Sequence, residues 1–252
     1  MKKVNITQSL IKEIDKDGCS IAIKHFLLGT ETKPSEAMLC GLYFEHYLIG
    51  GCRGGQVPEF KALKNGNKPK AQTDLDELIK RSKHILEANN IIIHEVQPEY
   101  KSDDIVGHLD AMGEIDGEKC IIDVKWTATK EDQKYNFGWA DPTIKEDAHI
   151  QAKHYVYTYY LAKEEVLPFY FLVFGKSGWI KKIRFDITHR ALMQHDEKIQ
   201  ETRAKLKAII DNDFAYEPHL GQCSACRYKD SCDNFSYKLK TEEYEIDDSQ
   251  FI

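Results

Sequence analysis

The sequence has no long apolar run and no excess of positive charge. Its 252 residues contain no hydrophobic stretch near the length of about 18 residues that a membrane-spanning helix needs. The formal net charge is -6 at pH 7, with 35 Lys and Arg against 41 Asp and Glu. Proteins that hold nucleic acid through bulk electrostatics are usually basic, so any nucleic acid would have to be held locally.

A secretory signal, internal repeats and low-complexity segments are also missing. The first residues, MKKVN, do not lead into the apolar core of a signal peptide, and the seven cysteines are an odd number. These features favour a reducing, cytoplasmic setting in which disulfides do not hold the fold. With 42% hydrophobic residues the chain can form one large core, so we expect a single domain over residues 1–252.

The apolar spacing predicts an α/β (α+β) fold. Helices are expected within residues 5–29 (two short ones) and over 35–50, 73–89, 143–162 and 188–211. Strands are expected from residue 91 and over 105–115, 118–125, 167–175 and 179–186. Ser35, Thr73 and Thr188 are the expected N-caps.

A hairpin is predicted with Asp116 and Gly117 as its turn, and its strands bring two carboxylates and a lysine together. This dipeptide favours a two-residue turn, which places Asp110 opposite Asp123. Side chains alternate along a strand, so Asp123 and Lys125 share one face. The carboxylates would form an oxygen-rich pocket suited to Mg²⁺ or Mn²⁺, and Lys125 could steer a metal-activated water. A surface hairpin with an ordinary Asp–Lys pair is the alternative interpretation.

Two helical segments provide further candidates for the same site. The early helix contains a carboxylate at Glu45 and an imidazole at His46. Gln151 and Tyr155 lie four residues apart, on one face of the first helix after the hairpin. Each signal is weak alone, because polar and aromatic residues on amphipathic helices are usually surface or rim residues.

Taken together, these motifs resemble the RecB-type and phage-exonuclease branch of the PD-(D/E)XK nucleases. They follow its order, G-x-x-x-(H/E), G-x-x-D, D-x-K and Q-x-x-x-Y, between Gly41 and Tyr155. The resemblance implies a restriction-endonuclease-like core, with a central mixed sheet flanked by helices. It also implies metal ligands, which would be Glu45, Asp110, Asp123 and the Val124 carbonyl.

The same resemblance implies the remaining roles. Lys125 would be the catalytic lysine beside Asp110 and Asp123, and Gln151 and Tyr155 would contact DNA near the cut. The helix position could instead be filled by His46, which is the other residue type used there. Trp126 departs from the pattern, because relatives usually have a small hydroxyl residue after the lysine.

Three cysteines near the C-terminus, Cys223, Cys226 and Cys232, have the spacing C-x2-C-x5-C. Such closeness indicates a metal site, which needs a fourth ligand. By resemblance to CRISPR-associated and AddB-type nucleases, that ligand would be Cys19 and the site would hold a 4Fe-4S cluster. Zinc is the rival, since four thiolates suit either metal. Residues 1–30 and 212–235 would form the cluster region, followed by an acidic tail at 240–252.

The predicted function is a Mg²⁺- or Mn²⁺-dependent deoxyribonuclease, an exonuclease that processes DNA ends in recombination, phage replication or CRISPR adaptation. Expected partners are DNA with a free end or single strand, and a recombinase, helicase or adaptation protein, with no membrane. One alternative is a non-catalytic DNA-binding or scaffold subunit that keeps the fold and cluster. Another is a zinc-containing RNA-processing protein. The intact set of Asp110, Asp123 and Lys125 counts against the scaffold.

Overall fold

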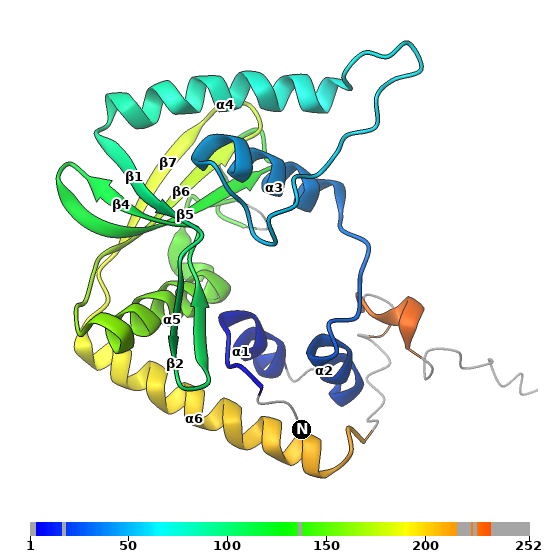
Figure 1. Cartoon of the computed structure of the whole chain (residues 1–252), viewed down its shortest axis with the longest axis vertical. Helices are drawn as coiled ribbons and strands as arrows, with labels where there is room; N and C mark the ends of the chain where they lie inside the picture. The colour runs from blue at the N-terminus through cyan, green and yellow to red at the C-terminus, as the bar shows by residue number, and fades with distance from the viewer. Residues whose placement is uncertain (1–3, 17–18, 136–137, 216–222, 224–225, 233–252) are drawn as a thin grey trace, which may run out of the picture.

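The computed structural model describes residues 4–16, 19–135, 138–215, 223 and 226–232. Its centre is a five-stranded sheet in the order β1-β4-β5-β6-β7, with helices on both faces (Figure 1). The strands are β1 (Ile91–Val96), β4 (Ala111–Ile115), β5 (Glu118–Thr127), β6 (Phe169–Gly175) and β7 (Ile180–Phe185). β5 and β6 are parallel, whereas the other neighbours are antiparallel. The predicted α/β class with a central mixed sheet is confirmed.

The helices begin close to the predicted caps, with one exception. They are α1 (Gln8–Asp15), α2 (Ser20–Leu27), α3 (Glu36–Ile49), α4 (Lys70–Ala88), α5 (Glu146–Lys163) and α6 (His189–Asp211), with 3-10 turns η1 (Pro142–Ile144) and η2 (Lys229–Ser231). Ser35 and Thr188 cap α3 and α6, because each hydroxyl accepts a hydrogen bond from a first-turn N–H. The cap predicted at Thr73 is wrong: α4 starts earlier, directly after Pro69, whose fixed φ suits a helix entrance.

The two faces of the sheet bury separate cores, since alternate side chains of a strand point to opposite sides. Phe169 and Phe171 of β6 pack against α1, α5 and α6. Tyr170 and Leu172 of the same strand pack against α3 and α4. In Figure 1, α3 and α4 lie above the sheet and α5 and α6 below it. Because β6 is covered on both faces, every one of its residues is buried.

The segment predicted as one strand, residues 105–115, is in fact two. Its first half is β3 (Ile105–His108), which pairs with β2 (Glu99–Ser102) and, through Ile105, with Ile6 of the N-terminal segment. Its second half is β4, which pairs with β5 in the predicted register, from Ala111 with Ile122 onward. The change of direction falls at Leu109, whose N–H donates to the Pro98 carbonyl at 3.0 Å. Asp110 therefore stands just before β4.

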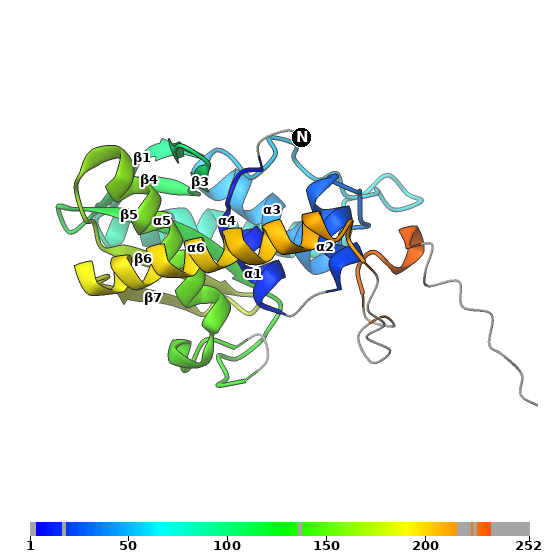
Figure 2. The ribbon, with the colours of Figure 1, turned by 90° about the horizontal axis from the view of Figure 1, so that it is seen from below.

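The described C-terminal segment packs against α1 and α2. Arg227 forms an ion pair of 2.7 Å with Glu13 of α1, and the Tyr228 ring stacks on His25 of α2 with centroids 5.5 Å apart. Figure 2 shows η2 beside α2, beyond the end of α6. The predicted acidic tail, residues 240–252, lies outside the described residues.

Over the described part of the chain, no helix combines the length and apolarity required to cross a bilayer.

Candidate functional site

The central sheet opens between β4 and β5 at the start of β4. β5 stays paired with β6 from Ile121 to Thr127, but its pairing with β4 ends at Ile122. Beyond that point the main chain of β5 can form other hydrogen bonds, and the Val124 N–H donates to Asp110 Oδ2 at 3.0 Å. The opening therefore brings Asp110 beside Val124, in the second half of β5, close to the position opposite Asp123 that the hairpin register predicts.

Asp123 lies at the centre of this opening and is 0% exposed. The ammonium of Lys125, two residues further along β5, forms an ion pair with Asp123 Oδ2. From α5, Gln151 Nε2 donates to Asp123 Oδ1 at 2.5 Å. Desolvation opposes the charge on Lys125, but Asp123 and Asp110 outweigh it and raise the pKa of the ammonium. Lys125 is thus held in its charged form.

Glu45 reaches the same place from α3, where it is 8% exposed. Desolvation by burial, followed by the charge of Asp123, raises the pKa of Glu45 to about 7. The same two causes raise the pKa of Asp110 well above its usual range. Carboxylates brought together out of water resist ionisation unless positive charge offsets them. The carboxylates therefore outnumber the positive charge beside them, and a further cation would stabilise their ionised forms.

Gln97, which the sequence did not single out, connects two of these carboxylate residues. Its side-chain Nε2 donates to Glu45 Oε1 at 2.6 Å, and its main-chain N–H donates to the Asp110 carbonyl at 2.9 Å. The backbone of Gln97 has φ 54°. A non-glycine residue with positive φ is uncommon, and such strain gathers at functional sites. The sequence signal is slight: Gln97 precedes Pro98, a position that marks an element boundary.

A basic cavity of about 440 Å³ adjoins the opening. Its lining consists of Lys12, Lys125, Trp139, Lys145, Glu146, Asp147, Ala148 and Gln151. Lys12 comes from α1, and desolvation by burial lowers its pKa to about 8. The Lys145 ammonium lies 4.8 Å from the centre of the Trp139 ring. The cavity thus combines ammonium groups from α1, from β5 and from the residue before α5 with the carboxylates of Glu146 and Asp147. No local motif reveals the contribution of α1.

The two predicted DNA-contacting residues, Gln151 and Tyr155, share the inner face of α5, where they are 7% and 4% exposed. Gln151 contacts Asp123 directly. Of the two candidates on α3, Glu45 is the one whose charge acts on Asp123 and Lys125. His46 stacks edge-on against Tyr47.

In the described part of the chain, no group of three or more His, Cys, Asp or Glu side chains already has an arrangement that holds a metal ion. The carboxylates are not arranged as metal ligands because their oxygens contact other groups: Lys125, Gln151, Gln97 and the Val124 N–H. The four cysteines predicted to bind a cluster are partly exposed and free: Cys19, Cys223, Cys226 and Cys232. The remaining cysteines are buried thiols: Cys40, Cys52 and Cys120.

No family model and no curated protein matches this chain. A solved structure does: a protein from Eubacterium rectale, provisionally designated an exonuclease, has a TM-score of 0.67 and 19% identity. The match covers 99% of this chain and 93% of that one. The chain shares the fold of that protein. An alkaline exonuclease from Laribacter hongkongensis has a TM-score of 0.47 and 13% identity, over 82% of this chain and 90% of that one. A score below about 0.5 does not establish a shared fold.

Proposed function

We propose that this protein is a metal-dependent nuclease that acts on DNA. The observation that carries the proposal is the convergence of three carboxylates, Glu45, Asp110 and Asp123, on one lysine at an opening in the sheet. The fold shared with a designated exonuclease supports it. An ordinary surface ion pair would not need a second and third carboxylate drawn out of water beside it.

A divalent cation suits this set of donors. Mg²⁺ and Mn²⁺ prefer oxygen ligands, and the cluster offers the carboxylates of Glu45, Asp110 and Asp123. The Val124 carbonyl is a fourth candidate, because the N–H and C=O of one strand residue point to the same side and the Val124 N–H faces Asp110. Such a cation, when bound, supplies an activated water and offsets charge on the scissile phosphate.

The protein's own groups would orient the reactants around that phosphate. Lys125, held charged by its carboxylate neighbours, would donate hydrogen bonds to the attacking water or to charge developing on the phosphate. Gln151 would keep the Asp123 carboxylate in position, with Tyr155 beside it and both near the DNA. Lys12 and Lys145, in the adjoining cavity, would contact the neighbouring phosphates.

Within this function, we propose an exonuclease that processes DNA ends. The designation of the Eubacterium rectale protein and the motif order both support an end-processing enzyme. Recombination, phage replication and CRISPR adaptation are the settings that the motif resemblance suggests. A recombinase, helicase or adaptation protein would be the corresponding partner.

A four-cysteine metal site is a separate proposal, with a 4Fe-4S cluster as the cofactor and zinc as the alternative. Its support is the C-x2-C-x5-C spacing and the packing of the intervening residues on α1 and α2. Cys19 directly precedes α2 as its N-cap. Arg227 and Tyr228, which directly follow Cys226, contact α1 and α2 respectively. Cys19 lies between these two helices in the chain.

The decisive experiment incubates end-labelled single- and double-stranded DNA with the protein in Mg²⁺, Mn²⁺ or EDTA. Asp123→Asn and Lys125→Met are expected to lower cleavage roughly a hundredfold or more while DNA binding stays near wild type. Asp116→Asn and Lys119→Met are matched controls on the same hairpin. Asp116 has φ 54°, a conformation that asparagine tolerates.

Two results would contradict the proposal. Metal-dependent cleavage at the wild-type rate in Asp123→Asn would show that the chemistry lies elsewhere. A wild-type protein that binds DNA but leaves it intact with either metal would instead support the scaffold alternative.

A further inference from the structure

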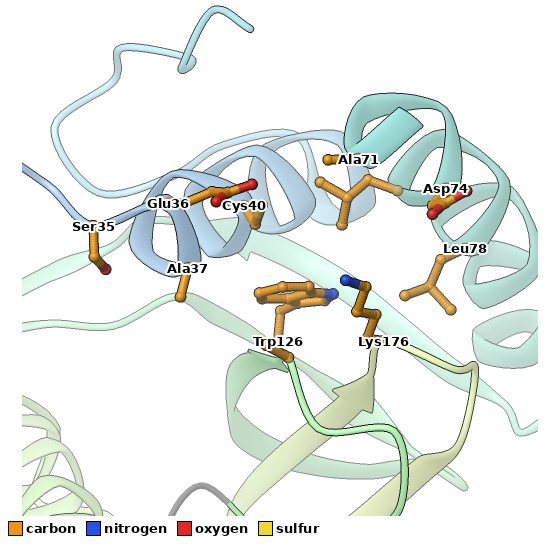
Figure 3. Close-up of a pocket in the computed structure, with 11 residues that line it drawn as sticks. Ser35, Glu36, Ala37, Cys40, Ala71, Asp74, Leu78, Trp126 and Lys176 are labelled. Carbon is orange, nitrogen blue, oxygen red and sulfur yellow. The ribbon is translucent and has the colours of Figure 1, made fainter. Parts of the chain in front are cut away.

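A second cavity, of about 410 Å³, lies between α3 and α4, on the face of β5 opposite Lys125 (Figure 3). Trp126 and Lys176 form part of its floor. Trp126 follows Lys125 directly, and since successive side chains of a strand alternate, it points to the α3–α4 side. Lys176 comes just after the end of β6, so the cavity lies by the C-terminal ends of β5 and β6, near the half of β5 that holds Asp123 and Lys125.

The indole N–H of Trp126 is buried and, in the described structure, has no hydrogen-bond partner. Figure 3 shows this nitrogen and the ammonium of Lys176 pointing toward one another. Neither group can satisfy the other, because an indole N–H and an ammonium are both donors with no acceptor lone pair. A buried donor left unpaired is costly, so an acceptor atom placed between the two would stabilise this wall of the cavity.

The rest of the lining indicates what carries that acceptor. Small and aliphatic side chains form an apolar slot: Ala37, Ala71, Leu75, Leu78 and Ala128. Carboxylates from Glu36 and Asp74 also line the cavity, and they disfavour an anionic ligand while they can accept hydrogen bonds from N–H groups. A neutral, flat ring that carries both a carbonyl and N–H groups matches this combination of contacts.

We propose that the cavity binds a carbonyl-bearing nucleobase of an unpaired nucleotide, an inference that rests on the proposed action on DNA. The base carbonyl would accept from Trp126 and Lys176, with the ring in the apolar slot. Adjacent Cα atoms of a strand are about 3.8 Å apart. Lys125 and Trp126 lie near the C-terminal end of β5 and face opposite sides of the sheet, so a single strand passing around this end would bring a phosphate to Lys125 and a nearby base to Trp126. Single-stranded ends carrying thymine, cytosine or guanine are favoured over adenine, because one carbonyl oxygen has two lone pairs and can accept from both donors, whereas each ring nitrogen of adenine has only one.

The test follows the indole signals of ¹⁵N-labelled protein by NMR during titration with free nucleosides. The chain has three tryptophans, so replacing each with Phe assigns its signal. Thymidine is expected to shift the Trp126 signal saturably. The Trp179 signal should stay in place, because that N–H already donates to the Thr129 carbonyl at 3.2 Å. Deoxyadenosine is expected to bind about threefold more weakly or worse, from the loss of one hydrogen bond.

Lysine variants provide the matched comparison. Lys176→Met is expected to weaken thymidine binding about tenfold, since a hydrogen bond to a charged donor is lost. Lys182→Met, on β7, is expected to leave thymidine binding unchanged.

Three outcomes would overturn the proposal: a Trp126 signal that thymidine does not move, equal binding of thymidine and deoxyadenosine, or an equal shift caused by acetate or inorganic phosphate. The last result would identify an anion site. Nucleoside binding needs neither metal nor cleavage. A failed cleavage assay therefore leaves this measurement intact, and failure here leaves the proposed nuclease activity intact.

Discussion

Replacing Glu45 with Gln tests whether the carboxylate cluster is built for a cation. Desolvation by burial, and then Asp123, raise the pKa of Glu45 from its ordinary 4.5 to about 7. The unfolded chain therefore ionises this group at a lower pH than the folded protein does. As pH rises from 4.5 through 7, the folded state loses up to about 3 kcal/mol of stability in the absence of metal. Above pH 7 the full cost is present.

The Glu45→Gln variant removes this cost and keeps an amide oxygen that can accept the hydrogen bond from Gln97. At pH 8 in EDTA we expect it to be more stable than the wild type by about 2 to 3 kcal/mol. In a chain of this size that difference raises the melting temperature by about 5 to 10 °C. The two proteins should converge as the pH falls toward 4.5, where Glu45 is protonated in the folded state.

The assay is urea unfolding at a series of pH values, in EDTA and in Mn²⁺. Because Mn²⁺ would bind the folded state, it should stabilise the wild type and have little effect on Glu45→Gln. Glu36→Gln, an exposed position on the same helix, is the control. A Glu45→Gln protein no more stable than the wild type at pH 8 in EDTA, with an unchanged denaturant slope, would refute the presence of unneutralised charge at Glu45.

Three further predictions concern the fold. Gly107→Ala should cost about 1 to 3 kcal/mol, because its Cβ would lie 2.2 Å from Thr158 Oγ1 of α5; urea unfolding would show it, and Thr158→Ala should recover part of the loss. The buried pair His154 and His195, whose pKa values desolvation lowers to about 4 and about 3, should cost stability as pH falls below 6.5. Because Glu45 acts in the opposite direction over this range, the measurement is made in Glu45→Gln, where an unfolding free energy constant from pH 7 to 5 would contradict the prediction. Cys226→Ser should lower the soluble yield and melting temperature. Wild-type protein purified without oxygen should be brown with a 4Fe-4S cluster and colourless with zinc, whereas unchanged melting and no bound metal would refute the four-cysteine site.

The hairpin could be predicted from sequence because its geometry is local. Asp116 and Gly117 both adopt positive φ, 54° and 82°, as a two-residue turn of this kind requires. That turn fixes the register of β4 with β5, and the continuation of this register brings Asp110 beside Val124 in the second half of β5. The period of two then puts Asp123 and Lys125 on one face. Two strands and a turn thus suffice to assemble most of the carboxylate cluster.

The parts that the sequence did not predict depend on contacts between distant segments. Gln97 is 52 residues from Glu45 in the chain, and nothing local marks it as the partner of that carboxylate. Lys12 enters the basic cavity only because α1 packs on α5 and α6. The break at Leu109 was missed because its apolar neighbours fit a continuous strand, whereas pairing with Ile6 and with β2 directs the two halves apart.

Helix α1 connects the C-terminal segment around Arg227 with the basic cavity. It has only eight residues, too few for a stable helix in isolation, so its order depends on the surfaces it touches. Two adjacent residues face different partners: Lys12 lines the basic cavity, and Glu13 is paired with Arg227. If α1 unfolds locally, both connections are lost in the same event. Amide hydrogen exchange in α1 and in the segment around Arg227 should therefore report one cooperative unit, and loosening the C-terminal segment would withdraw a lysine from the basic cavity.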